Sequence, residues 1–284
     1  MEMLAVSMPD FTRMSWVSEE AKQTWEPRLK RIADAWSEVE WRSVASSVRR
    51  CALTVVGSHD FVSRAGRWAE HGLNAMPLEI QGLSQYSYAS TNVREEAGKP
   101  FAYRIVLGKP PNVTRFKRAF DAHDDAEMAR LLGYPSCCSA FFRNVWVDRA
   151  LVDTTWSMAE ASGGRREGER WIEIDGPDEC NILWRWMGVR AVPHMPCRFD
   201  CARTLRFAGR LLDLACRSGY GREMAWLREI LSWPVEWSAL HGIAEIKTPI
   251  LRVATRTIPT AQEHVVRRQG HGFPSAGTRG VGFP

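Results

Sequence analysis

Apolar and polar positions near the start of the chain predict a long helix over residues 18–50, in which tryptophans recur at helical spacing. Ser18 can cap this helix, acidic residues fill its first turn and arginines stand at its end, an order of charges that suits the helix dipole. Pro27 is expected to kink or break it. Runs of β-forming residues at 51–56 and 101–107 are too short for helices and predict strands.

Short helices are predicted over residues 114–121 and 124–132, the second of which ends at Gly133. Residues 160–170 have no apolar periodicity, and we expect them to form an exposed loop between two halves of the chain. The elements predicted after this loop are a strand at 171–174, helices from about 178, over 201–217 and over 225–231, and strands at 235–240, 243–247 and 250–255.

This order of elements predicts an α+β fold, mainly helical with short strands, in which two halves pack around a cysteine-ligated metal site. Residues 1–160 would form the N-terminal half and residues 171–258 the C-terminal half. From residue 259 the chain is polar and rich in glycine. We expect residues 259–284 to be a tail that is pinned to the body or mobile, or alternatively a flap over a site.

The composition excludes several classes of protein. With 45% hydrophobic and 25% charged residues, the chain resembles a globular protein rather than a disordered, collagen-like or coiled-coil one. It contains no run of about 18 uncharged apolar residues that could cross a bilayer. Its first 14 residues lack a basic segment followed by an apolar one, so we expect a cytoplasmic protein without a membrane partner. Walker, Rossmann, nucleophile-elbow and zincin motifs are absent.

Seven cysteines in 284 residues are too few for a disulfide scaffold, and clustered cysteines in a reducing compartment more often bind metal or perform chemistry. Four of them form two groups: Cys137 and Cys138 follow the Gly133 stop, and Cys197 and Cys201 precede the long helix. Each group is expected to lie at a helix N-terminus. The partial positive charge there lowers a thiol pKa and favours the thiolates that soft metals bind.

Spacing indicates how many of these thiols could serve one centre. Cys197 and Cys201 are four residues apart, so a turn that enters a helix can direct both sulfurs to one point. Neighbouring helical residues are about 100° apart, so Cys137 and Cys138 are not expected to converge easily. Cys138 is the expected inward ligand, whereas Cys137 could be a further ligand, a group behind the ligands or a reactive thiol. His194 is the other candidate for a fourth ligand.

Three thiolates around one centre describe a [4Fe-4S] cluster with an open iron, or a zinc ion with one exchangeable ligand. A closed set of four ligands would instead be structural. Among the other cysteines, Cys51 and Cys216 are expected to be thiols that pack in the core. Cys180 could be either a packing thiol or a member of the site.

The same residues carry a family resemblance. Over about residues 125–220 the chain resembles the paired motifs of the DUF483 family. The motifs are Leu132-Gly133-Tyr134-Pro135-Ser136-Cys137-Cys138 with Phe141-Phe142 downstream, and His194-Met195-Pro196-Cys197 followed by Cys201. The resemblance brings no activity with it. It implies that the two cysteine motifs belong together.

The leading hypothesis is a metalloenzyme whose [4Fe-4S] cluster acts through an open iron on a small molecule, by lyase, hydrolytic or sulfur-transfer chemistry. The alternative is a non-catalytic protein in which Cys138, His194, Cys197 and Cys201 close a structural zinc site. In that case basic residues at 114–118, at 165–166 and in the tail would contact nucleic acid. The net charge of +5 favours nucleic acid only weakly, since acidic residues are interleaved with the basic ones.

Overall fold

The computed structural model describes residues 11–82, 95–149, 153–166 and 168–277. Within them, strands form a larger sheet in the order β1-β9-β8-β7-β10-β6-β5 and a smaller sheet in the order β2-β4-β3. The strands are β1 (Thr12–Trp16), β2 (Cys51–Gly57), β3 (Asn74–Gly82), β4 (Phe101–Gly108), β5 (Arg165–Arg166), β6 (Trp171–Ile174), β7 (Val235–Leu240), β8 (Ile243–Lys247), β9 (Leu251–Arg256) and β10 (His264–Arg268).

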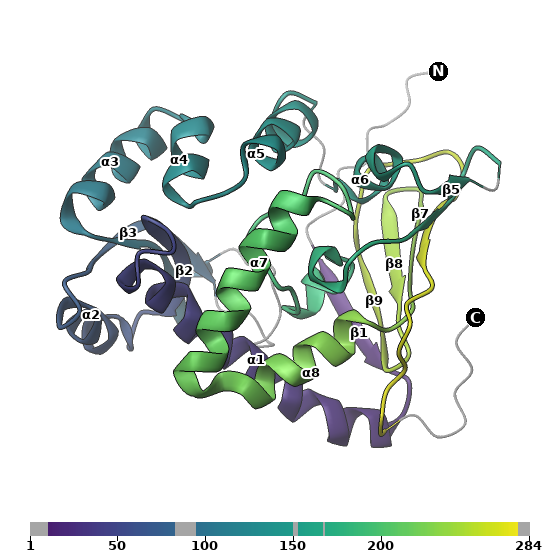
Figure 1. The fold of residues 1–284 in the computed structure, drawn as a ribbon, viewed down its shortest axis with the longest axis horizontal. Coiled ribbons are helices and arrows are strands. Elements are labelled where there is room, and N and C mark those ends of the chain that lie inside the picture. The colour runs from purple at the N-terminus through teal and green to yellow at the C-terminus, as the bar shows by residue number, and fades with distance from the viewer. Residues whose placement is uncertain (1–10, 83–94, 150–152, 167, 278–284) are drawn as a thin grey trace.

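The helices cover both sheets and complete the predicted α+β fold. They are α1 (Glu19–Ala45), α2 (Phe61–Ala69), α3 (Pro110–Asp121), α4 (Asp125–Leu131), α5 (Ser136–Phe142), α6 (Thr155–Ser162), α7 (Ala202–Ala215) and α8 (Gly221–Leu231). Figure 1 shows the larger sheet at one end of the molecule and the smaller sheet with α2 and α3 at the other, and α7 and α8 between them.

Helix α1 belongs to the cores of both ends. Its Trp25 is fully buried in the main core, which is formed with α7, α8 and the larger sheet, whereas Trp41 packs against the smaller sheet. The backbone N–H of Ala21 donates to Ser18 Oγ at 3.0 Å, so the predicted cap is confirmed. Pro27 lies inside the helix without ending it. Burial of neighbouring side chains, each contributing about 1.5–3 kcal/mol, offsets the proline.

Several other predictions differ from the structure. The helix predicted from residue 178 is only a short 3₁₀ turn, Asp178–Cys180, because the Asn181 side chain donates to Leu231 O and accepts from Leu183 N, which ties the backbone down as a loop. The segment predicted as a loop at 160–170 contains the last residues of α6 and the whole of strand β5. Strand β5 pairs with β6. Strands β1 and β3 and helices α2 and α6 were not predicted.

The segment predicted as a tail contributes a strand to the larger sheet. Strand β10 lies between β7, to which it is antiparallel, and β6, to which it is parallel. Residues 259–277 are therefore part of the fold, and neither a mobile tail nor a flap is found there. Residues 278–284 of the predicted tail lie outside the described residues.

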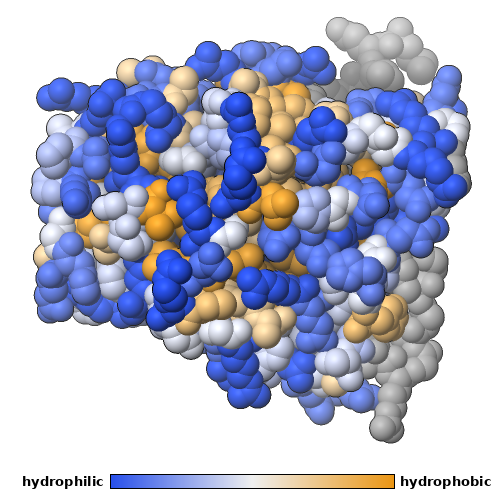
Figure 2. All heavy atoms as spheres, in the orientation of Figure 1, coloured by the Kyte–Doolittle hydropathy of each residue, from blue (hydrophilic) through white to orange (hydrophobic). Residues whose placement is uncertain are grey.

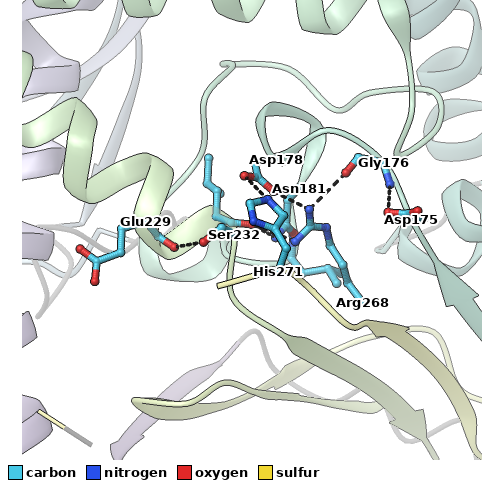
Figure 3. A network of polar contacts seen from close by, with 10 residues as sticks. Asp175, Gly176, Asp178, Asn181, Glu229, Ser232, Arg268 and His271 are labelled. Atoms are coloured by element: carbon cyan, nitrogen blue, oxygen red, sulfur yellow. Dashed lines mark hydrogen bonds and ion pairs between the residues drawn. The ribbon is translucent and has the colours of Figure 1, made fainter. Parts of the chain in front are cut away.

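A polar network fixes the chain beyond β10 (Figure 3). Arg268 is buried, donates to Leu231 O at 3.0 Å and to Gly176 O at 3.1 Å, and pairs with Asp178 at 2.5 Å. His271 contacts the other oxygen of Asp178 at 2.9 Å. These contacts hold β10 against the loop that follows β6. Strands from before and after the 160–170 segment share the larger sheet. The division of the chain into two halves stays a prediction.

Candidate metal centre

The first cysteine pair is placed by the sharp turn between α4 and α5. Gly133 ends α4 with φ +74, and a Cβ there would lie 3.1 Å from Arg49 Cβ, so glycine suits both the backbone angle and the close approach. Pro135 then leads into α5, which places Cys137 and Cys138 in its first turn, as predicted. The helix continues through a π turn over Arg143–Val147.

The second pair is placed by the entry into α7. Residues 188–200 contain no regular element, and Cys201 is the N-cap residue of α7. The Asp200 carboxylate pairs with the Arg198 guanidinium, and a backbone hydrogen bond from Thr204 in the first turn of the helix reaches the Cys201 thiol. One turn into α7, the buried Thr204 directs its hydroxyl back towards the sulfurs.

All four predicted cysteines converge. The Sγ atoms of Cys137, Cys138, Cys197 and Cys201 lie within 4.8 Å of one another. The Cys138–Cys201 separation is 3.7 Å, and Cys137 Sγ lies 3.9 Å from the sulfurs of both Cys138 and Cys201. The argument against adjacent cysteines was therefore wrong. Helical side chains lean towards the N-terminus, so two neighbours in a first turn can reach a point beyond the helix end.

The four thiols differ in burial and in hydrogen bonding, and therefore in pKa. Cys138 and Cys201 are buried, whereas Cys137 and Cys197 are half-buried. Burial raises the pKa of the Cys138 thiol well above its usual value and that of Cys197 to about 12. Burial acts in the same direction on Cys201, but hydrogen bonds, first among them the Thr204 hydroxyl, outweigh it and lower this pKa to about 7. A cation that replaced the protons would stabilise all the thiolates together.

His194 contributes no atom to this group. Its Nε2 lies 3.0 Å from Thr204 Oγ1, which in turn lies 3.3 Å from Cys138 Sγ. Burial, reinforced by Arg190 and Arg49, lowers the pKa of His194 to about 3, so the imidazole is neutral. His194 therefore contacts the cysteines through a hydroxyl, in the way that groups behind a metal's ligands orient them. The sequence did not single out Thr204, whose role depends on the docking of α7.

The remaining cysteines lie outside the group. Cys51 is fully buried at the start of β2, as predicted. Cys180 is buried with its Sγ 3.6 Å from Cys201 O, and burial raises its pKa to about 12. Cys216 is exposed at the end of α7, so the prediction that it packs in the core was wrong. Leu205 of the same helix is likewise exposed.

A cavity of about 870 Å³ adjoins the cysteines. Cys138 and His194 form part of its wall, and apolar side chains from the smaller sheet and from α3 to α5 form much of the rest: Leu53, Leu78, Phe116, Phe120, Met128, Leu132 and Phe142. Figure 2 shows apolar residues at the surface over this region, framed by hydrophilic ones. The sequence did not predict the cavity, since its walls come from distant segments.

Most of the basic residues considered for nucleic acid form ion pairs within the protein. The pairs are Arg115–Glu127, Lys117–Asp121, Arg165–Glu173, Arg166–Glu160, Arg267–Glu236 and Arg268–Asp178. Arg279 lies outside the described residues. Among those that are described, no helix is both long and apolar enough to span a bilayer.

Comparison with known proteins adds no assignment to this geometry. The resemblance to the DUF483 family accordingly stays a prediction based on the two cysteine motifs. No family model, no curated protein and no solved structure matches this chain.

Proposed function

We propose that the protein is a zinc protein in which Cys137, Cys138, Cys197 and Cys201 bind one ion in a closed, structural site. The separations of the sulfur atoms carry this proposal. Four sulfurs at ~2.3 Å from a tetrahedral zinc ion are ~3.8 Å apart. The separations that involve Cys137, Cys138 and Cys201 are 3.7–3.9 Å, and all four sulfurs lie within 4.8 Å.

This spacing favours a single ion over a [4Fe-4S] cluster. In a cluster each thiolate binds a different iron, so the sulfurs spread around a larger body and stand roughly 6 Å apart. Four sulfurs no more than 4.8 Å apart would have to separate to admit one. All-thiolate, four-coordinate sites are typical of structural zinc.

The ion would join parts of the chain that are distant in sequence. Cys137 and Cys201 are 64 positions apart, and they belong to α5 and to the start of α7. Closing so long a loop costs chain entropy, which the free energy of metal binding would offset. Four thiolates fill a tetrahedral zinc, so this site offers no open position for Lewis-acid catalysis.

Elemental analysis of the purified protein tests the proposal. We expect one zinc per chain, and loss of that zinc on Cys→Ser substitution at each of the four positions. Cys180→Ser is the matched control, because this thiol is also buried beside Cys201 but lies outside the group. Full zinc content in all four variants would contradict the proposal.

A small-molecule metalloenzyme is the second candidate, and the cavity favours it. A compound held there would contact the wall formed by Cys138 and His194. If the centre is an iron–sulfur cluster with an open iron, this position would suit a substrate. Anaerobic purification followed by iron and sulfide analysis separates the candidates: stoichiometric iron and sulfide would support the enzyme, and their absence beside one zinc would reject the cluster.

A further inference from the structure

The exposed face of α7 carries a row of arginines beside the cysteine group. Arg203, Arg206 and Arg210 follow one another at intervals of three and four residues, which places them on one side of the helix. All three are exposed. Among the residues that the structure describes, none of the three forms an ion pair, unlike most of the basic residues of the loop and the tail.

We propose that this arginine row binds the phosphate backbone of a nucleic acid. The row lines a groove of about 570 Å³ whose other walls include Gly133, Pro135 and Ser136, and Asp213 is the carboxylate on the groove. Hydrophilic side chains gather over α7 in Figure 2. The proposal does not depend on which metal the cysteines bind.

Contacts within the protein already orient two of the three guanidinium groups. Arg203 Nη1 donates to Ser136 Oγ at 2.7 Å, and the Arg210 guanidinium lies 5.5 Å from the centre of the Phe207 ring. Arg206 lies between them. Guanidinium groups bind phosphate oxygens in pairs of hydrogen bonds, and holding them in place in advance reduces the entropy lost on binding.

The length of the row favours a strand over a single phosphate. Seven residues of helix from Arg203 to Arg210 extend ~10 Å. Over that length each strand of a duplex displays about three phosphates, at ~3.4 Å per phosphate along the axis. Phe207 is only 2% exposed, so the groove offers no aromatic face on which a base could stack. Binding should therefore be independent of sequence.

Fluorescence polarisation with a labelled mixed-sequence DNA duplex tests the proposal on the metal-loaded protein. With about three phosphates neutralised, affinity should fall about 40-fold between 50 and 200 mM salt. In Arg206→Gln the affinity should fall only about 12-fold over the same range. This variant makes one phosphate contact fewer, so its binding releases fewer counterions. Arg206 suits this test because, within the described part of the chain, it forms no hydrogen bond or ion pair with the cysteine segments, so metal content should be unchanged.

A triple variant with Arg203, Arg206 and Arg210 changed to glutamine should lose binding. The matched control changes Arg13, Arg118 and Arg252, which are also exposed and form no ion pair within the described ranges, and it should bind as the wild type does. Equal loss in both triples, or no binding by the wild type at 50 mM salt, would overturn the proposal. Displacement of the duplex by polyglutamate at equal charge would also overturn it, in favour of an acidic polypeptide. Zinc analysis of each variant shows separately whether the metal site is intact.

Discussion

Loss of the Cys138 thiol should abolish metal binding and with it the stability that the bound metal adds to the folded protein. The side chain is 1% exposed, and its Sγ lies 3.7 Å from Cys201 Sγ and 3.3 Å from Thr204 Oγ1. Cys138→Ala therefore removes a proposed zinc ligand from the buried side of the group, where no thiol from solution can replace it. We expect the variant to purify without zinc and to melt a few degrees below the wild type treated with a strong chelator, because it also loses the packing of a buried thiol.

The size of the effect follows from linkage. Free zinc at about 1,000 times its dissociation constant stabilises the folded state by about 4 kcal/mol. In a chain of this size 1 kcal/mol corresponds to about 2–4 °C in melting temperature, so chelation should lower the wild-type value by about 8–16 °C. Cys138→Ala should melt about 2–4 °C below the chelated wild type, with or without chelator, since loss of the buried thiol costs about a further 1 kcal/mol.

Cys180→Ala gives the internal reference for this experiment. It removes a buried thiol outside the group, at a cost of about 1 kcal/mol, and should still lose a further 8–16 °C on chelation. Differential scanning calorimetry of the wild type, Cys138→Ala and Cys180→Ala, each with and without chelator, measures all of these melting temperatures. The reasoning would be refuted if the chelator did not change the melting temperature of the wild type, or if it still lowered that of Cys138→Ala.

Three further perturbations probe the surroundings of the site and the fold. Thr204→Val, which removes the hydroxyl beside Cys138, should weaken zinc binding about 10–100-fold without abolishing it, as measured by competition with a chromophoric chelator. Arg268→Met should destabilise the protein by about 3 kcal/mol in urea unfolding, since it breaks the ion pair with Asp178 and removes the donor to Leu231 O and Gly176 O; an unchanged midpoint would contradict the structural role of β10. Burial alone would raise the pKa of Glu236, but hydrogen bonds from two basic side chains outweigh it and hold this pKa below its usual value. The stability that these bonds supply is present above the unfolded pKa of about 4.3 and is lost as pH falls through the folded pKa, so unfolding of Glu236→Gln should depend less steeply on acid than that of the wild type.

The parts of the fold that local pattern determines were predicted well. Helix α1 with its Ser18 cap, strand β2, and strands β7 to β9 lie within a few residues of their predicted bounds. Strand β10 was missed because it lies in a polar, glycine-rich segment and its partners lie elsewhere in the chain: Val265 pairs with Trp171 and with Ser238. Such a strand is stabilised by its neighbours rather than by its own sequence.

The candidate site likewise has residues that the local sequence predicts and residues that only tertiary contacts bring into place. Cys138, Cys197 and Cys201 were predicted as ligands because helix starts and spacing are local properties. The convergence of Cys137 with the other thiols depends on how the start of α5 packs against the start of α7, and the spacing of residues in the sequence does not reveal this contact. Thr204 and the cavity wall depend on the same tertiary contact.

X-ray absorption at the zinc edge tests the central claim most directly, because it reports the identity and number of the atoms bound to the metal. The account predicts zinc with four sulfur neighbours at ~2.3 Å and no nitrogen or oxygen neighbour in the first shell. A protein that carries iron with iron–iron scattering, or zinc bound by fewer than four sulfurs, would contradict a closed site formed by Cys137, Cys138, Cys197 and Cys201.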